Sequence, residues 1–472
     1  MLWKNIETTL VLKSTNKTSK VIGEVFNAGS VAVVGASGDP NKFGFMTLES
    51  IIRGGYEGKL YAVNPKGGEI LGVKACPSLS DVPEPLDTII VIVPAKFVSA
   101  VLKEAAAKGV TGAIIQSAGF REAGRMDLEQ ELLAVSKECG IRLLGPNMQG
   151  INYLPNKLCA MFFPVIKTRG PLAIVSQSGS VTAALSEWAD RDGLGISAAI
   201  NLGNQTDICE ADYLDFLVED RNIHTIVMYL EGLKDGRRFL TALEKAAHRK
   251  PVVALKSGRS ETGAKSAASH TGSMAGNHET FSAACRQYGA VSVQDLVALY
   301  DSAKGLACIK PPKGKRIMII STSGGAATVS VDEAESLGLI VPSLPAELRA
   351  GLERLHLSPL AHISNPLDLA GIEADHFLET ARMVDQYAIA DSILINFADP
   401  VSGAAEVVRT LASELKASLA VSYMGGGEEE MKGSFEIQRI GLGVFPSPER
   451  AVRSMAAAAW RAQYQRRRAA RN

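Results

Sequence analysis

The sequence predicts an α/β protein built from three doubly wound units. Short β-branched runs alternate with longer helical patterns along most of the 472 residues. The runs are continuously apolar, as strands are when helices cover both faces of a parallel sheet. The length suits two to four domains. Forty-four glycines without a regular period indicate many tight strand-to-helix turns, and such turns are common phosphate-binding sites.

The first unit is expected over residues 22–150. Its strands are predicted at 30–35, 59–63, 88–93 and 112–117, and its helices at 45–54, 98–108 and 126–139. The second unit, 160–308, has predicted strands at 171–176, 224–230 and 251–256. The third, 315–460, has predicted strands at 315–322, 392–396 and 418–422. The boundaries are placed in 151–170 and in the proline-containing linker 310–314. The arginine-rich tail, 461–472, is predicted to be a solvated helix end.

The second and third units open alike. An apolar strand leads into Ser176-Gln177-Ser178-Gly179 in one and Ser321-Thr322-Ser323-Gly324-Gly325 in the other, and a helix follows. This similarity is either a distant internal repeat or a common solution to the same turn.

Composition excludes several classes of protein. Lys+Arg and Asp+Glu both number 50, so the net charge is +0, which argues against a global footprint for nucleic acid or an anionic membrane. No apolar run approaches the ~18 residues of a membrane-spanning helix, and no signal peptide is visible. The six cysteines lack CxxC or Cys–His metal spacing. We therefore expect a cytoplasmic protein with reduced thiols and no metal.

A phosphate-binding turn is predicted at the start of the chain's first unit. Val34-Gly35-Ala36-Ser37-Gly38 lies between a predicted strand and a predicted helix, although it matches GxGxxG imperfectly. The next strand ends in Asn64-Pro65-Lys66, where a dinucleotide site would place an acid. A lysine there favours a ligand with an extra phosphate on the ribose side, such as coenzyme A or NADP. The alternative is that Asn64-Pro65 only shapes a turn and Lys66 is solvated.

Further loops are expected along the same sheet edge, because ligands of open α/β sheets bind at the carboxyl ends of the strands. They follow the third strand at Val93-Pro94, the fourth at 116–120, and the last at Gly145-Pro146-Asn147-Met148-Gln149-Gly150.

A long small-residue segment in the second unit surrounds one histidine, His270. The stretch 256–276 is rich in Gly, Ser, Thr and Ala, which suits a loop that moves and lets a phosphate approach. Imidazole is a good phosphoryl acceptor when a partner holds its second nitrogen. Glu231, at the end of the 224–230 strand, is the candidate partner. Each residue also has a plainer alternative. His270 would then be a structural histidine, as most lone histidines are, and Glu231 would be an exposed acid at a strand end, which is common.

Two helix starts are candidates to receive the phosphoryl group, at Ser176–Ser180 and at Ser321–Gly325. Free N–H groups and serine hydroxyls form an anion site there. Simple N-capping by serine is the alternative.

These residues, in this order, resemble the succinyl-CoA synthetase-like enzymes, and most closely the α subunit of NDP-forming acyl-CoA synthetases of the ADP-forming acetate–CoA ligase type. The resemblance covers roughly residues 25–460. Ser269–Gly276 resembles the family's phosphohistidine loop, and 365–369 its additional CoA-ligase-like domain. Gly203-Asn204 and Asp207 match a further family loop. The resemblance implies a Rossmann-like CoA-binding domain followed by two flavodoxin-like domains.

The resemblance also implies roles for individual residues. Catalysis would fall to His270 and Glu231. Phosphate would be bound by Ser176, Gln177, Ser178, Gly179, Ser180 and Gly272. Coenzyme A would be bound by Gly35, Ala36, Ser37, Lys42, Asn64, Pro65, Lys66, Val93, Pro94, Ser117 and Asn147.

One position departs from the family pattern. Met148 stands where the family usually has cysteine, close to the expected thiol end of CoA. It either alters the acyl pocket or fills space. The pocket is expected near Met148, Asn152 and Phe162-Phe163, and these residues indicate no more than a small or medium carboxylic acid.

The resemblance further implies an acid–CoA ligase with a phosphohistidine intermediate. It would interconvert acyl-CoA, ADP and phosphate with carboxylic acid, CoA and ATP. Three α/β units leave no segment for the ATP-grasp unit that family members need, and no Walker-type run is present. We therefore expect a separate ATP-grasp β subunit, which carries ADP or ATP and Mg²⁺, in an α2β2 heterotetramer. A small acid or acyl-CoA is the expected substrate.

Two rival functions remain. The first is a non-catalytic CoA-binding regulator or inactive synthetase-like subunit; such relatives are expected to lose the loop histidine, which this chain retains. The second is an NADP-dependent oxidoreductase, which leaves the 269–276 loop unexplained.

Overall fold

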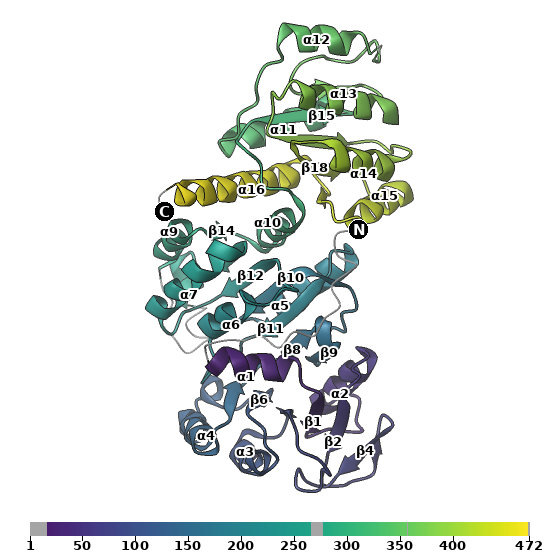
Figure 1. Cartoon of the computed structure of the whole chain (residues 1–472). Coiled ribbons are helices and arrows are strands. Elements are labelled where there is room, and N and C mark those ends of the chain that lie inside the picture. The colour runs from purple at the N-terminus through teal and green to yellow at the C-terminus, as the bar shows by residue number, and fades with distance from the viewer. Residues whose placement is uncertain (1–16, 266–276, 356, 471–472) are drawn as a thin grey trace. The chain divides into compact units, whose positions relative to one another are not determined.

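The computed structural model describes residues 17–265, 277–355 and 357–470, and confirms the α/β class. The described residues fall into two compact units. One comprises residues 17–191 and 195–292, and the other 192–194 and 293–470. The first unit holds two sheets and the second holds one (Figure 1).

The first sheet has the strand order of a Rossmann fold. Its order is β3-β4-β2-β1-β5-β6-β7, which without the edge strand β3 reads 3-2-1-4-5-6. All pairs are parallel except β3 with β4. The strands are β1 (Ser30–Val34), β2 (Lys59–Val63), β3 (Glu69–Ile70), β4 (Val73–Cys76), β5 (Thr88–Val91), β6 (Gly112–Ile115) and β7 (Arg142–Leu144). The helices are α1 (Lys17–Phe26), α2 (Phe43–Arg53), α3 (Val98–Ala107) and α4 (Met126–Cys139), with 3₁₀ turns η1 (Ala95–Phe97) and η2 (Arg121–Ala123).

The second sheet has the order β14-β13-β12-β10-β11-β8-β9. If β10 is counted as the first strand, the run β11-β10-β12-β13-β14 has the order 2-1-3-4-5, as in flavodoxin. The strands are β8 (Gly150–Tyr153), β9 (Leu158–Met161), β10 (Arg169–Ser176), β11 (Ile196–Asn201), β12 (Thr225–Leu230), β13 (Val252–Lys256) and β14 (Val291–Val293). The helices are α5 (Gly179–Arg191), α6 (Glu210–Leu217), α7 (Gly236–Arg249) and α9 (His278–Tyr288), with the 3₁₀ turn η3 (Leu154–Asn156).

A hairpin occupies much of the segment 151–170, which we expected to be a boundary. Strands β8 and β9 pair antiparallel to each other, and β8 pairs antiparallel to β11, so the hairpin extends the second sheet. Each strand is only four residues long and fully buried, which hides the alternation that identifies a hairpin in sequence. The limits of the three domains remain a prediction.

The third sheet is entirely parallel, in the order β16-β15-β17-β18-β19, again 2-1-3-4-5. Its strands are β15 (Ile317–Ser321), β16 (Leu367–Asp368), β17 (Ser392–Phe397), β18 (Ser418–Tyr423) and β19 (Val444–Phe445). The helices of this unit are α10 (Leu296–Cys308), α11 (Gly324–Ser336), α12 (Ala346–Glu353), α13 (Ala374–Gln386), α14 (Ala404–Glu414), α15 (Glu428–Arg439) and α16 (Pro448–Ala469).

The C-terminal tail is a helix end, as expected, and Arg466 and Arg467 are exposed, but its first residue is buried. It does continue a helix, α16, but Arg461 is only 4% exposed. Burial lowers the pKa of Arg461 to about 10. Helix α16 packs along α10 and α11, so the face that carries Arg461 is turned toward protein. Arginine count alone cannot show which helix face is buried.

The second and third sheets share one turn geometry. The Ser176 hydroxyl donates to the Ser178 carbonyl at 2.8 Å and accepts the Ser178 N–H at 3.1 Å. Ser321 and Ser323 form the same two bonds with the same lengths. The common strand order and the common turn favour the internal repeat.

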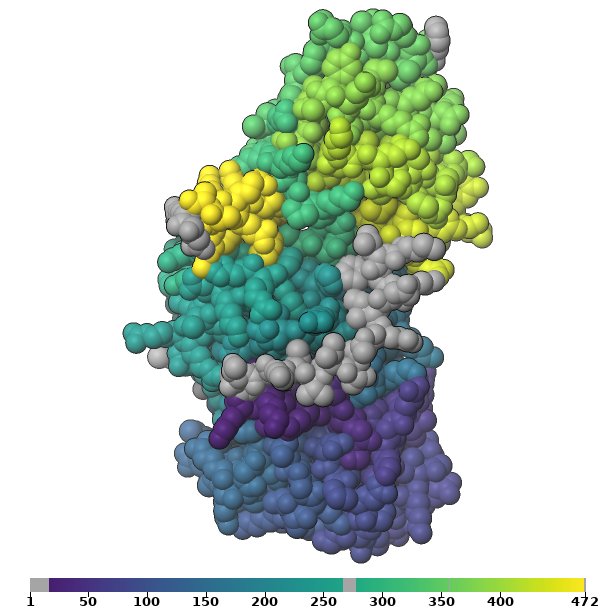
Figure 2. Space-filling model, viewed as in Figure 1, coloured from purple at the N-terminus to yellow at the C-terminus, as the bar shows by residue number. Residues whose placement is uncertain are grey.

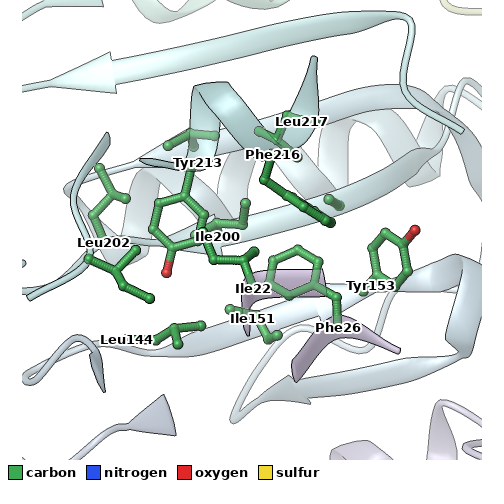
Figure 3. Close-up of a cluster of buried hydrophobic side chains, with 14 of the residues drawn as sticks. Ile22, Phe26, Leu144, Ile151, Tyr153, Ile200, Leu202, Tyr213, Phe216 and Leu217 are labelled. Carbon is green, nitrogen blue, oxygen red and sulfur yellow. The ribbon is translucent and has the colours of Figure 1, made fainter. Parts of the chain in front are cut away.

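A continuous hydrophobic core joins the first and second sheets. Helix α1 lies between them, and the ring of Phe26 lies 5.1 Å from both Tyr153 of β8 and Phe216 of α6 (Figure 3). Leu144 of β7 and Ile200 of β11 belong to the same cluster. In the space-filling view, α1 is the purple band along the border of the blue layer that contains the first sheet (Figure 2). This packing fixes the two sheets relative to each other and so positions the loops at their edges.

Candidate functional site

The turn after β1 depends on two glycines. Gly35 has φ +94°, and a Cβ there would lie 2.2 Å from the carbonyl of Ile92. A Cβ on Gly44, at the start of α2, would lie 2.0 Å from the carbonyl of Gly35. Both approaches are too close for any side chain. The helix start therefore lies directly against the turn, at the point between β1 and β5 where the strand order reverses.

The second strand end is tied to this turn. The Asn64 side-chain amide donates to the Ala36 carbonyl at 2.7 Å, and its Oδ1 accepts the Lys66 N–H at 2.8 Å. Asn64 therefore shapes a turn, as one of our alternatives stated, and Lys66 is exposed. Ser37 accepts the N–H of Asp39 at 3.1 Å.

A cavity of about 570 Å³ lies where the carboxyl edges of the two sheets meet. Its size is typical of a small-molecule site. The first sheet contributes residues that follow β5, β6 and β7, and the second contributes residues that follow β10, β11 and β12. The lining residues are Phe43, Ile92, Val93, Gln116, Ser117, Ala118, Arg121, Asn147, Met148, Gln149, Phe162, Gln177, Ser178, Gly179, Ser180, Asn201, Gly203, Asn204, Gln205, Glu231, Gly232, Leu233 and Lys234.

Eight of the predicted site residues line this cavity: Val93, Ser117, Asn147, Gln177, Ser178, Gly179, Ser180 and Glu231. Another set lies along the sheet edge outside it: Gly35, Ala36, Ser37, Lys42, Asn64, Pro65, Lys66 and Pro94. Ser176 is fully buried beneath the α5 turn. His270 and Gly272, with the rest of the 269–276 loop, lie outside the described residues.

The start of α5 presents unused backbone donors to the cavity. Ser178 caps the helix weakly, since its hydroxyl accepts the Val181 N–H at 3.4 Å. Within the described residues, the N–H groups of Gly179 and Ser180 have no hydrogen-bond partner. Free N–H groups at a helix start attract anions. Capping and anion binding are therefore compatible here.

Gln177 fixes Glu231 beside this helix start. Its Oε1 accepts the N–H groups of Glu231 and of Gly232, the latter at 3.0 Å, and its Nε2 donates to the Gly232 carbonyl at 2.9 Å. The buried ammonium of Lys256 donates to the Glu231 carbonyl at 3.2 Å. All these bonds hold the backbone of the strand end, so the Glu231 carboxylate takes no part in them. The residue is 7% exposed and lines the cavity.

The loop 203–207 joins the second sheet to the first. Asn204 donates from its amide to Glu122 at 2.6 Å and to Glu129 at 3.0 Å, and its Oδ1 accepts from Asn147 at 3.2 Å. Burial alone would raise the pKa of Glu122, but hydrogen bonds from Asn204 and from the Gly119 and Phe120 N–H groups leave it below its usual value.

Asp207 completes this junction. Its carboxylate accepts two hydrogen bonds from Arg142, at 2.7 and 2.8 Å, and a third from the Leu143 N–H at 2.9 Å. The loop matched in sequence through Gly203-Asn204 and Asp207 therefore holds Asn147 in place from the opposite sheet.

Aromatic and apolar side chains form another part of the cavity wall. Phe43 stacks on Phe162 with ring centroids 4.5 Å apart. Met148 is 3% exposed, belongs to the core that joins the sheets and lines the cavity, so it both fills space and borders the site. Asn152, which we expected near the acyl pocket, is fully buried in β8 and does not line it.

Sequence reasoning did not single out several lining residues as site residues, including Arg121, Gln149, Gln205 and Lys234. Arg121 and Lys234 follow strand ends that were identified correctly, within a few residues of Gly119 and Glu231. Their position after strands at the ligand-binding edge was the available signal. Gln149 lies in the predicted edge loop 145–150, and Gln205 lies between Asn204 and Asp207 of the matched loop, but which of their side chains line the cavity depends on how the two sheets pack.

Comparison with known proteins agrees with this geometry. A family model described as a CoA binding domain matches residues 29–154, and one described as a succinyl-CoA ligase like flavodoxin domain matches residues 169–306. The chain therefore combines a CoA-binding domain with a flavodoxin-like domain of the succinyl-CoA ligase type.

Relatives that align with nearly the full chain identify its family more closely. The α subunit of ADP-forming acetate–CoA ligase I from Pyrococcus furiosus is 37% identical over 456 residues, 93% of this chain and 98% of that one. ADP-forming acetate–CoA ligase I from Archaeoglobus fulgidus is 35% identical, covering 90% of this chain and 61% of its own. A structure of the dinucleotide-forming acetyl-coenzyme A synthetase 1 from Ca. Korarchaeum cryptofilum, in complex with phosphate and ADP, superimposes with a TM-score of 0.87 at 31% identity, covering 95% of this chain and 98% of that one. The chain belongs to the ADP-forming acetate–CoA ligase family.

Membrane-spanning helices and metal-binding clusters are both absent from the described residues. Among the described residues, no helix is both long and apolar enough to cross a membrane. The same residues contain no cluster of His, Cys, Asp and Glu that would hold a metal ion.

A buried acid behind the cavity makes stability depend on pH. Glu210, the first residue of α6, is 1% exposed, and its Oε2 has no hydrogen-bond partner among the described residues. Burial raises the pKa of Glu210 from 4.5 to about 7, against smaller opposing effects that include the charges of Lys234 and Arg238. Because the folded state holds this proton more tightly, stability is full below pH 4.5 and falls as the pH rises to about 7.

We therefore expect Glu210→Gln to stabilise the protein at pH 8 and to have little effect at pH 4.5. The gain at pH 8 is on the order of 3 kcal/mol, since each pKa unit corresponds to about 1.4 kcal/mol. Thermal unfolding of wild type and variant at both pH values measures it. Glu219→Gln is the control: hydrogen bonding to Arg249 lowers the pKa of Glu219, so its loss gives no gain at pH 8. An equal effect of Glu210→Gln at both pH values would contradict this account.

Proposed function

We propose that the chain is the α subunit of an ADP-forming acid–CoA ligase. It would interconvert acyl-CoA, ADP and phosphate with carboxylic acid, CoA and ATP. The observation that carries this proposal is the cavity, where the CoA-side strand ends, the anion-binding start of α5 and Glu231 meet in one space. Membership in the ADP-forming acetate–CoA ligase family supports the same reaction.

Coenzyme A would extend along the edge of the first sheet. The turn at Gly35, Ala36 and Ser37, with Lys42, would bind its pyrophosphate. Asn64, Pro65 and Lys66 lie at the neighbouring strand end and would contact the 3′-phosphate of the adenosine. Val93, Pro94, Ser117 and Asn147 would line the route of the pantetheine arm into the cavity. The described residues fit this ligand, because the turn offers backbone groups to phosphates and the cavity has an apolar wall.

His270 would carry the phosphoryl group. Its imidazole would accept phosphate from an acyl phosphate formed in the cavity and later transfer it to ADP. The start of α5 would stabilise the transferred charge, together with Gly272 of the loop. Glu231 would hold the second imidazole nitrogen and stabilise the charged phosphohistidine. Catalysis of this kind rests on positioning and electrostatics.

A second subunit would supply the nucleotide site. The chain spans 98% of an α subunit from Pyrococcus furiosus but only 61% of the ligase from Archaeoglobus fulgidus, whose remaining sequence this chain does not match. We infer an ATP-grasp β subunit that binds ADP or ATP with Mg²⁺, in an α2β2 assembly. A cytoplasmic setting suits the six unpaired cysteines.

The test is turnover by the chain co-expressed with a β subunit. The complex should release CoA from acyl-CoA over many turnovers only when phosphate, ADP and Mg²⁺ are all present, because without ADP the reaction stops at the phosphorylated enzyme. The same assay across a panel of acids and acyl-CoA thioesters would identify the substrate. If the complex binds CoA without turnover, the chain is a CoA-binding regulator and not a ligase subunit. If turnover depends on a nicotinamide cofactor, the chain is an oxidoreductase.

A further inference from the structure

The two positively charged side chains that line the cavity differ in whether they form an ion pair. Three lining side chains carry charge: Arg121, Glu231 and Lys234. Arg121 is paired, since its Nε lies 3.5 Å from Glu129 and its Nη2 donates to the Asn204 carbonyl. Lys234 forms no ion pair with any described residue. Among the described residues, Lys234 is therefore the charged cavity side chain whose ammonium lies in no ion pair, although Glu129 and Glu210 are near enough to act on its charge.

Lys234 lies close to the anion-binding start of α5. It is two residues beyond Gly232, and the side chain of Gln177 bonds Gly232 directly to the turn before α5. The Lys234 ammonium donates one hydrogen bond, to the Gln205 carbonyl, which leaves two N–H donors. The residue is also accessible to solvent, as a group that binds a diffusing anion must be. Partial burial lowers the pKa of Lys234 and the charge of Arg121 adds to this effect, while the carboxylates of Glu129 and Glu210 oppose it.

A phosphate held in this cavity needs a cation. Hydrogen phosphate carries two negative charges at neutral pH, and the carboxylate of Glu231 lines the same space. The free N–H groups of α5 supply only partial positive charge. A lysine ammonium is a compact point charge well suited to phosphate oxygens, and Lys234 is the cavity cation without an ion pair among the described residues.

We propose that Lys234 binds the phosphoryl group in the cavity, first as inorganic phosphate and then as the acyl phosphate. This inference rests on the proposed function. In the step concerned, a phosphate oxygen forms a bond to the thioester carbonyl carbon, the carbon–sulfur bond breaks, and the phosphate proton leaves with the sulfur as CoA thiol. Lys234 would hold the phosphate oxygens that do not react, which lowers the repulsion from Glu231.

A purely structural role for Lys234 makes different predictions. Its bond to Gln205 would then only stabilise the 203–207 loop. Lys250 provides a matched control, because its ammonium also donates to backbone carbonyls, those of Leu217 and Asp220, but it does not line the cavity. Loss of such a lysine lowers stability without a specific effect on phosphate.

The experiment measures KM for phosphate and for acyl-CoA in the complex with the β subunit. Lys234→Met should raise the phosphate KM about 10- to 100-fold, as expected for loss of a hydrogen bond to a charged group, and leave the acyl-CoA KM within about twofold. Lys234→Arg should recover part of the loss. Lys250→Met should lower the melting temperature and leave the phosphate KM unchanged. If the Lys234→Met protein does not fold, the same two KM values are measured for Lys234→Gln.

The outcomes separate the two proposals. An inactive wild-type complex would overturn the ligase assignment itself. An active wild type with an unchanged phosphate KM in Lys234→Met would overturn only the role of Lys234. An equal rise in both KM values would mean general damage to the cavity and would also overturn it.

Discussion

Replacing His270 with asparagine should abolish ligase turnover, with a loss of at least about 10³-fold. Asparagine has no imidazole nitrogen to accept the phosphoryl group, so the acyl phosphate has no route to ADP. The measurement is ATP formation from acyl-CoA, phosphate and ADP by the complex with the β subunit. CoA binding should persist in the variant, because the residues proposed to bind CoA lie on the first sheet.

A second histidine provides the control for this variant. His278 begins α9, and its Nδ1 lies 3.2 Å from the Lys256 carbonyl. It does not line the cavity, so His278→Asn should keep turnover within a few-fold of wild type. Normal turnover in His270→Asn, or an equal loss in both variants, would remove His270 from the mechanism.

Glu231→Gln should lower turnover by about 10²- to 10⁴-fold, the range seen when a carboxylate that orients a catalytic imidazole is neutralised. The change is isosteric, and the bonds from Gln177 and Lys256 reach only the Glu231 backbone, so the strand end should keep its conformation. What is lost is the negative charge that stabilises the phosphohistidine. The measurement compares kcat with the KM for CoA, and only kcat should fall.

Asp235→Asn is the matched control for Glu231→Gln. Asp235 lies four residues further along the same loop and accepts the Arg238 N–H at 3.0 Å as the N-cap of α7. Asparagine caps a helix about as well as aspartate, so this variant should keep both its stability and its kcat close to wild type. A Glu231→Gln enzyme with wild-type kcat would show that the carboxylate serves only the fold.

The order of strands and helices was predictable because each strand is a local apolar run. β2 and α4 have the predicted bounds, and most other elements differ by one to three residues. The hairpin of β8 and β9 was missed, since four-residue buried strands resemble any short apolar segment. Burial of Arg461 was missed because a helix sequence does not show which neighbours cover it.

The site was predictable where a backbone turn creates it. Gly35 and Ser178 follow strands in a sequence pattern that only a tight turn satisfies. The cavity itself was not predictable, because it forms where two sheets meet and their packing is a tertiary property. Asn204 illustrates this limit: its sequence matched the family, but its bonds to Glu122 and Asn147 depend on contacts between the sheets.

The central claim is that this chain carries phosphate on His270. The most direct measurement incubates the complex with acyl-CoA and radiolabelled phosphate without ADP, then tests the protein for bound phosphate and maps it by mass spectrometry. The account predicts an acid-labile, alkali-stable phosphoprotein, with the phosphate on the peptide that contains His270 and release of the label as ATP when ADP is added. An active complex that forms no phosphoprotein, or carries the phosphate on another residue, would contradict it.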